Sequence, residues 1–120
     1  MDKNITDASV ERLDEIVEEI GFISQCLEID PESSELLNKR GLKRVELHKG
    51  ALQHLKETDK SALIDHHLED AMDDYEAALG SAVSCEELVE IHFNYGDAHF
   101  LLGNSGSAEG HYKIALQIDS

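Results

Sequence analysis

The segments AMDDYEAAL at residues 71–79 and AEGHYKIAL at residues 108–116 share one pattern, Ala-x-x-x-Tyr-x-x-Ala-Leu. The two copies begin 37 residues apart, at Ala71 and Ala108, and the pattern agrees position for position. Its spacings of three, four and seven residues place both alanines and the tyrosine on one face of a helix. Small residues on that face let antiparallel helices approach closely, and the aromatic ring fills the space beside them. The repeat therefore predicts closely paired helices.

Five helices are expected, because apolar residues recur with helical spacing between four breaks. The breaks are Pro31, Glu57-Thr58-Asp59-Lys60, Gly80-Ser81 and Gly103-Asn104-Ser105. No segment alternates with the period of a strand, and 120 residues suit one domain. We therefore predict an all-α domain over residues 1–120, with a leading helix at 5–30, a long helix pair at 33–80 and a regular pair at 85–120.

Two serines are the expected N-caps of helices. Ser33 follows Pro31, and Ser84 opens the sequence Ser84-Cys85-Glu86-Glu87, which has the Ser-x-x-Glu form of a capping box. We expect the last helix to begin near Ser107 and to end near Ile118. These signals place the helix starts independently of the repeat.

With these features the chain resembles the tetratricopeptide repeat family, a 34-residue helix-turn-helix motif. The family has Gly or Ala at position 8, Ala at positions 20 and 27, and an aromatic residue at 24. In the regular pair these positions are Gly96, Ala108, Ala115 and Tyr112; in the long pair they are Gly41, Ala71, Ala78 and Tyr75. His92 and His99 depart from the pattern at positions 4 and 11, where bulky apolar or aromatic residues are usual.

The long pair contains an insertion. Gly41 to Ala71 spans 30 residues, whereas Gly96 to Ala108 spans 12, so 18 residues are extra. Apolar residues within the insertion keep helical spacing, which favours added helical turns on both helices, ~13 Å of length, over a disordered loop. The resemblance then implies a short right-handed solenoid of about five helices with one elongated hairpin.

The resemblance also implies a protein-interaction scaffold or adaptor, which binds a peptide or protein segment along the concave face. The candidate partner-binding residues, taken from the family's groove positions, are Asn38, Leu42, Val45, Glu90, Phe93, Asp97 and Phe100. This set mixes apolar residues with carboxylates and contains no Lys or Arg, so we expect a partner with basic and apolar side chains. For the same reason we do not expect the clamp for a terminal carboxylate that part of the family has.

The charge of the chain excludes several classes of function. Ten basic residues face 26 acidic ones, and the formal net charge is −16. Nucleic acids and anionic membrane surfaces both require a basic surface, so neither is an expected partner. No apolar run reaches the length of a membrane span, and the first residues lack the apolar core of a signal peptide. Cys26 and Cys85 have no metal or redox spacing, and we expect a cytoplasmic protein with both cysteines at core or boundary positions.

Two alternative functions remain open. The C-terminal helix has no further helix after it to cover Ile114, Leu116 and Ile118, so the chain could be a self-assembling module, such as a homodimer, that joins through this end.

The second alternative is a histidine-based metal binder, since the chain has seven histidines. His92 and His99 lie seven residues apart on one face, where we expect hydrogen-bonded packing, and His54 and His67 would meet across the long hairpin. No nucleophile or cofactor motif is present, and we expect neither enzymatic activity nor a cofactor.

Overall fold

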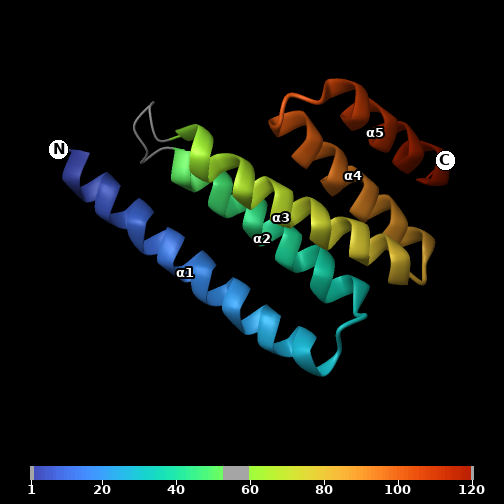
Figure 1. The fold of residues 1–120 in the computed structure, drawn as a ribbon, viewed down its shortest axis with the longest axis horizontal. Helices are drawn as coiled ribbons and strands as arrows, with labels where there is room; N and C mark the ends of the chain where they lie inside the picture. The colour runs from blue at the N-terminus through green and yellow to red at the C-terminus, as the bar shows by residue number, and fades with distance from the viewer. Residues whose placement is uncertain (1, 53–59, 120) are drawn as a thin grey trace.

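The computed structural model describes residues 2–52 and 60–119, and the chain within these ranges is almost entirely helical (Figure 1). The helices are α1 (Asp2–Ile29), α2 (Ser34–Leu52), α3 (Lys60–Ser81), α4 (Cys85–Leu101) and α5 (Ser105–Asp119). No strand occurs among these described residues. The all-α prediction is confirmed, and so is the number of helices.

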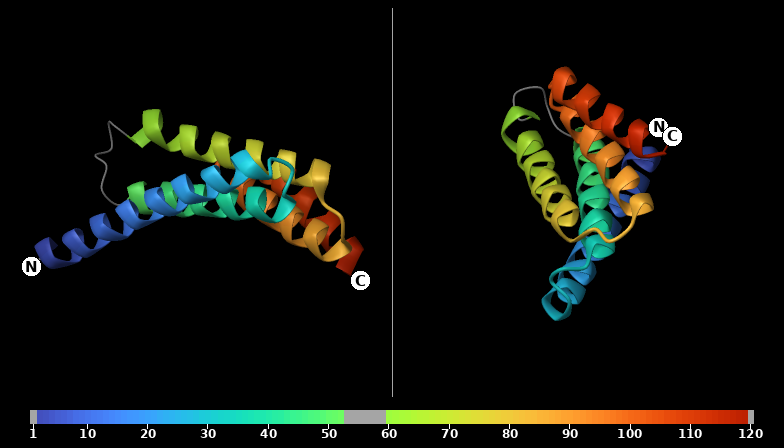
Figure 2. Two further views of the ribbon diagram at one scale, coloured as in Figure 1. Left: turned by 90° about the horizontal axis from the view of Figure 1, so that it is seen from below. Right: turned by 90° about the vertical axis from the view of Figure 1, so that its right-hand side faces the viewer.

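Helix α2 is the centre of the arrangement, because it packs against α1, α3 and α4. Helices α2 and α3 form one antiparallel pair, α4 and α5 form a second, and α3 also contacts α4 (Figures 1 and 2). The core lies where these helices meet, and its fully buried members include Leu68, Tyr75 and Ile91. None of the described helices is both long and apolar enough to cross a membrane.

Both helix pairs are joined by a contact between a glycine and a tyrosine, which we call the Gly–Tyr contact. A Cβ atom added at Gly41 would lie 2.6 Å from Cε1 of Tyr75, and one added at Gly96 would lie 2.7 Å from Cε1 of Tyr112. Such distances leave no room for a side chain, so each ring lies directly on the opposite helix. The four repeat alanines, Ala71, Ala78, Ala108 and Ala115, are all buried. The two sequence copies therefore occupy the same packing positions.

The insertion is helical wherever it is described, as predicted. Helices α2 and α3 contain 19 and 22 residues, against 17 and 15 for α4 and α5. The break expected at 57–60 lies outside the described residues, except for Lys60, which is the first residue of α3. The long pair thus gains its length from helix.

Most helix ends lie close to their predicted places. Helix α1 begins at Asp2 rather than near residue 5, and α5 begins at Ser105 rather than Ser107. The earlier start of α5 follows from Gly103, whose φ of 88° turns the chain sharply enough for the Ala108 amide to donate to the Asn104 carbonyl. Cys85 is exposed at the start of α4, so it is not the core or boundary residue that we expected.

Both predicted N-caps form, but the capping box is incomplete. The Leu36 and Glu87 amides donate to the hydroxyls of Ser33 and Ser84, each at 3.2 Å. The Glu87 carboxylate, however, accepts a hydrogen bond from the Ser34 hydroxyl on α2. A neighbouring helix thus takes the carboxylate that the Ser-x-x-Glu pattern assigned to its own helix start.

Candidate functional site

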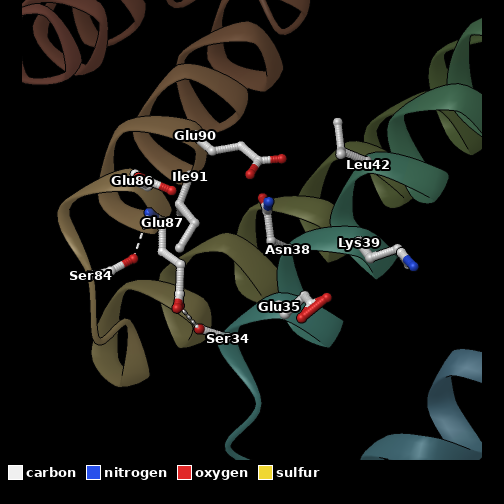
Figure 3. Close-up of a pocket in the computed structure, with 10 residues that line it drawn as sticks. All are labelled: Ser34, Glu35, Asn38, Lys39, Leu42, Ser84, Glu86, Glu87, Glu90 and Ile91. Atoms are coloured by element: carbon white, nitrogen blue, oxygen red, sulfur yellow. Dashed lines mark hydrogen bonds between the residues drawn. The ribbon is translucent and has the colours of Figure 1, made fainter. Parts of the chain in front are cut away.

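Two adjoining cavities lie between α2 and α4. The first, of about 360 Å3, is lined by Ser34, Glu35, Asn38, Lys39, Leu42, Ser84, Glu86, Glu87, Glu90 and Ile91 (Figure 3). The second, of about 340 Å3, is lined by Lys39, Leu42, Lys43, Val45, Glu46, Lys49, Tyr75, Asn94 and Asp97. Because Lys39 and Leu42 line both, the cavities form one trough along the two helices. We call them the acidic cavity and the lysine cavity.

The two cavities carry opposite charge. The acidic cavity has four glutamates and one lysine, whereas the lysine cavity has three lysines with Glu46 and Asp97. In the acidic cavity the Glu90 carboxylate extends from α4 across the gap toward α2 (Figure 3). The trough therefore offers a negative end and a mildly positive end to a ligand.

The floor of the trough is a hydrogen bond between two buried amides. Asn94 Nδ2 donates to Asn38 Oδ1 at 3.0 Å, and each residue is less than 10% exposed. Asn38 lines the acidic cavity and Asn94 lines the lysine cavity. Because a buried amide is costly to leave without a partner, this bond fixes α2 against α4. The trough consequently has a rigid, polar base.

Helix α2 supplies the positive charge of the trough. Five of the ten basic residues of the chain lie on it: Lys39, Arg40, Lys43, Arg44 and Lys49. Three of them hold other helices, since Arg40 and Arg44 bind Asp74 on α3 at 2.8 and 2.7 Å, and Lys43 binds Glu19 on α1 at 3.1 Å. Lys39 and Lys49 are exposed and form no ion pair within the described part of the chain. Their charges are available to a ligand.

Five of the seven sequence-predicted partner-binding residues line this trough. Asn38 and Glu90 line the acidic cavity, Val45 and Asp97 line the lysine cavity, and Leu42 lines both. Val45 is only 7% exposed and belongs mainly to the core. Leu42 is 39% exposed and is the chief apolar contact surface of the trough.

Phe93 and Phe100 do not line either cavity. Their side chains are 53% and 62% exposed, and the Phe93 ring lies 5.4 Å from that of Tyr112 on α5. They belong to the α4 surface beside α5, away from α2. The structure thus separates them from the other five residues.

The expectation that the groove contains no basic residue is wrong. Lys39, Lys43 and Lys49 line the lysine cavity, although none is at a groove position of the resembled family. The trough is wider than the stripe defined by those positions, and it includes neighbouring side chains of α2. A helical stripe from Lys39 through Leu42 and Glu46 to Lys49 was visible in the sequence and would have found them.

A cluster of rings between α4 and α5 is the second candidate site. His92 Nδ1 and His111 Nδ1 lie 3.1 Å apart, and His111 stacks on Tyr95 and on His99 at centroid distances of 4.3 and 5.3 Å. Burial lowers the pKa of His92, His99 and His111, and for His111 the other two histidines lower it further. We call this the histidine stack, and its members are held in the neutral form.

The histidine stack does not form a metal site of ordinary type. Within the described residues no group of three or more His, Cys, Asp or Glu side chains could hold a metal ion. His92 has the hydrogen-bonded packing role that we expected, but the buried His99 Nδ1 has no hydrogen-bond partner. The other suggested pair, His54 with His67, cannot be assessed because His54 lies outside the described residues.

Comparison of the sequence with protein-family models and with curated proteins found no match. The site is therefore interpreted from its own geometry.

Proposed function

We propose that this chain is an interaction module of tetratricopeptide type, a short right-handed solenoid that binds an extended segment of a partner protein in the trough between α2 and α4. The observation that carries the proposal is the trough itself, with its rigid Asn38–Asn94 base, its exposed Leu42 and its two ends of opposite charge. Such a surface suits a peptide with one apolar residue between charged ones.

The dimensions of the trough limit the length of the segment. Asn38 and Val45, near the middles of the two cavities, are seven residues apart on α2, which is ~10 Å along a helix. An extended peptide covers that distance in about three residues. We therefore expect a short recognition motif, with a basic residue for the acidic cavity about three positions from the residue that enters the lysine cavity.

Selection from a library of random peptides tests this proposal. Peptides selected on the wild-type protein are labelled, and their affinities are measured by fluorescence polarisation. Leu42→Arg places a bulky charge in the trough and should weaken binding by about tenfold or more. Leu116→Arg changes an exposed leucine of α5, outside the trough, and should leave the affinity unchanged. Circular dichroism confirms that both variants fold.

The opposite result would overturn the proposal. If Leu116→Arg abolished binding while Leu42→Arg had no effect, the partner would bind on α5. A library that yields no specific peptide for the wild-type protein would also count against a peptide-binding trough.

A second candidate function is self-assembly through α5. On this helix Ile114 is 39% and Leu116 is 69% exposed, as expected for an uncovered C-terminal helix, while Ile118 is half-buried. Light scattering at increasing concentration tests it: a dimer mass that Leu116→Arg converts to a monomer mass supports self-assembly, and a monomer mass throughout excludes it.

A cytoplasmic location completes the proposal. It is supported by the free thiols of Cys26 and Cys85, which suit a reducing compartment.

A further inference from the structure

The Tyr75 hydroxyl is a buried polar group without a hydrogen-bond partner. The residue is fully buried, and its Oη atom has no partner among the described residues. Tyr75 is also the one residue of α3 that lines the lysine cavity. Since the far end of its ring, Cε1 and Cζ, lies against Gly41 of α2, the hydroxyl end of the side chain is the part that reaches the cavity. A buried donor left in this way is costly, so a missing partner is indicated.

The second hairpin shows what such a hydroxyl normally meets. There Tyr112 Oη donates to Asp97 Oδ1 at 2.6 Å, and Asp97 is the residue after the glycine of that Gly–Tyr contact. In the first hairpin the residue after the glycine is Leu42, which has no acceptor. The donor of Tyr75 is thus left over because the chain supplies an acceptor in one hairpin and not in the other.

The charges around the lysine cavity indicate what kind of acceptor is absent. Lys39, Lys43 and Lys49 face Glu46 and Asp97, a balance of one positive charge. Lys43 is engaged by Glu19 and Glu46, while Lys39 and Lys49 have no ion pair among the described residues. One positive charge matches a singly charged carboxylate better than a phosphate dianion, which would be repelled by the two resident carboxylates.

We propose that the lysine cavity binds one carboxylate of the partner segment, which accepts a hydrogen bond from Tyr75 Oη and lies between the ammonium groups of Lys39 and Lys49. This inference rests on the proposed peptide-binding function and names the chemistry of one end of the ligand. The partner motif then has a carboxylate at the lysine cavity and a basic residue at the acidic cavity.

The state of Tyr75 suits this role. Burial raises the pKa of Tyr75, and Asp97 and Asp74 raise it further, so the hydroxyl keeps its proton and acts as a donor. A hydrogen bond from a buried donor to a charged acceptor is among the stronger polar contacts in proteins. The hydroxyl would therefore contribute both affinity and selection for an acidic group.

A small carboxylate tests the site without knowledge of the partner. N-acetylglutamate amide, which has one side-chain carboxylate, is titrated into 15N-labelled protein, and the glutamine analogue serves as the neutral control. We expect saturable shifts of the Asn94 side-chain amide and of amides around Lys49 with the glutamate compound only. Tyr75→Phe, which keeps the ring on Gly41, should weaken this binding about tenfold. Tyr95→Phe removes a hydroxyl outside the cavity and should not change it.

Three results of this titration would overturn the inference. They are the absence of saturable shifts with either compound, equal shifts with both, and equal affinity of the Tyr75→Phe and wild-type proteins. In each case an ordered water molecule would be the simpler partner of the Tyr75 hydroxyl.

The selected peptides separate this inference from the proposed function. Replacement of their Asp or Glu by Asn or Gln should weaken binding to the wild-type protein about tenfold, and this loss should disappear in Tyr75→Phe. Amidation of the C-terminus shows whether the carboxylate is terminal or on a side chain. Peptides that bind the trough but tolerate both changes would refute the carboxylate site and leave the peptide-binding function intact.

Discussion

The two helix hairpins share a packing register but are fastened by different chemistry. Each has the Gly–Tyr contact at the same place. Beside it, the first hairpin has an ion-pair triad, in which the buried Asp74 binds Arg40 and Arg44. Arg40 also donates to Ser24, so the triad connects α1, α2 and α3.

The second hairpin has rings at the same positions. Counted from the glycine and the tyrosine of each contact, the equivalents of Asp74, Arg40 and Arg44 are His111, Tyr95 and His99. These three rings stack on one another. The comparison shows that the small residues set the register and that the flanking positions are then free to use either charges or rings. The first solution holds charged groups together, whereas the second requires its imidazoles to be neutral.

The largest expected effect is the loss of the triad. Asp74→Ala leaves Arg40 and Arg44 side by side without their carboxylate, and we expect the free energy of unfolding to fall by about 3 kcal/mol. His111→Ala, at the equivalent position of the second hairpin, loses stacking only and should cost about 1 kcal/mol. Urea denaturation measures both. Equal losses in the two variants would show that the hairpins are not fastened differently.

A smaller difference is expected at the glycines. In Gly41→Ala the new methyl group meets the ring of Tyr75, which is fully buried and cannot move away, so a loss of about 2 kcal/mol is expected. In Gly96→Ala the ring of Tyr112 is at the end of the molecule and can shift, and the higher helix propensity of Ala offsets part of the cost.

Thermal unfolding of both glycine variants decides the point. The prediction is that Gly41→Ala melts well below Gly96→Ala. A reversed order would mean that the Ala108 carbonyl, 3.2 Å from the added methyl group at Gly96, is the harder obstacle.

Acid should loosen the second hairpin before the first. Because the pKa values of His92, His99 and His111 are lowered in the folded protein, the unfolded chain takes up protons first. The stability that these groups provide is complete above the ordinary pKa of 6.5 and is lost as pH falls from 6.5 toward the lower folded values. Amide exchange on α4 and α5 should rise over this range relative to α2.

A variant without the histidine stack is the control for the acid effect. His92→Gln/His99→Gln/His111→Gln should show no extra exchange on α4 and α5 between pH 7 and 5. If its pH dependence matched that of the wild-type protein, other groups would be responsible.

The smallest expected effect concerns the helix caps. Ser33→Ala and Ser84→Ala each remove one hydroxyl acceptor, from Leu36 and Glu87 respectively, and should cost about 1 kcal/mol each. Similar costs, measured by urea denaturation, would show that the hairpins differ in their fastening and not in how their helices start. A loss above about 2 kcal/mol for either serine would mean that its role extends beyond capping.

The sequence predicted the features of the fold that depend on local patterns. Helix number follows from the apolar spacing, and the register of each hairpin follows from small residues and a tyrosine at fixed positions. The cap at Ser84 was also predictable, whereas the use of the Glu87 carboxylate by Ser34 was not. That contact joins residues 53 positions apart, and no local pattern encodes it.

The site was only partly predictable for a similar reason. Leu42 and Glu90 follow from the family's groove positions, but Lys49 lies beyond them on the elongated part of α2. Phe93 and Phe100 occupy groove positions, yet they have no helix opposite them on which to form a cavity with α4. The free hydroxyl of Tyr75 depends on the leucine at position 42, a pairing that appears only when the two hairpins are compared.

The central claim is that a partner segment lies in the trough between α2 and α4, and intermolecular nuclear Overhauser effects test it most directly. A selected unlabelled peptide is bound to 13C,15N-labelled protein, and isotope-filtered spectra are recorded. We predict contacts from the peptide to the Leu42 methyl groups and to the Asn94 side-chain amide. Contacts confined to Ile114 and Leu116 on α5, with none to Leu42, would contradict the claim.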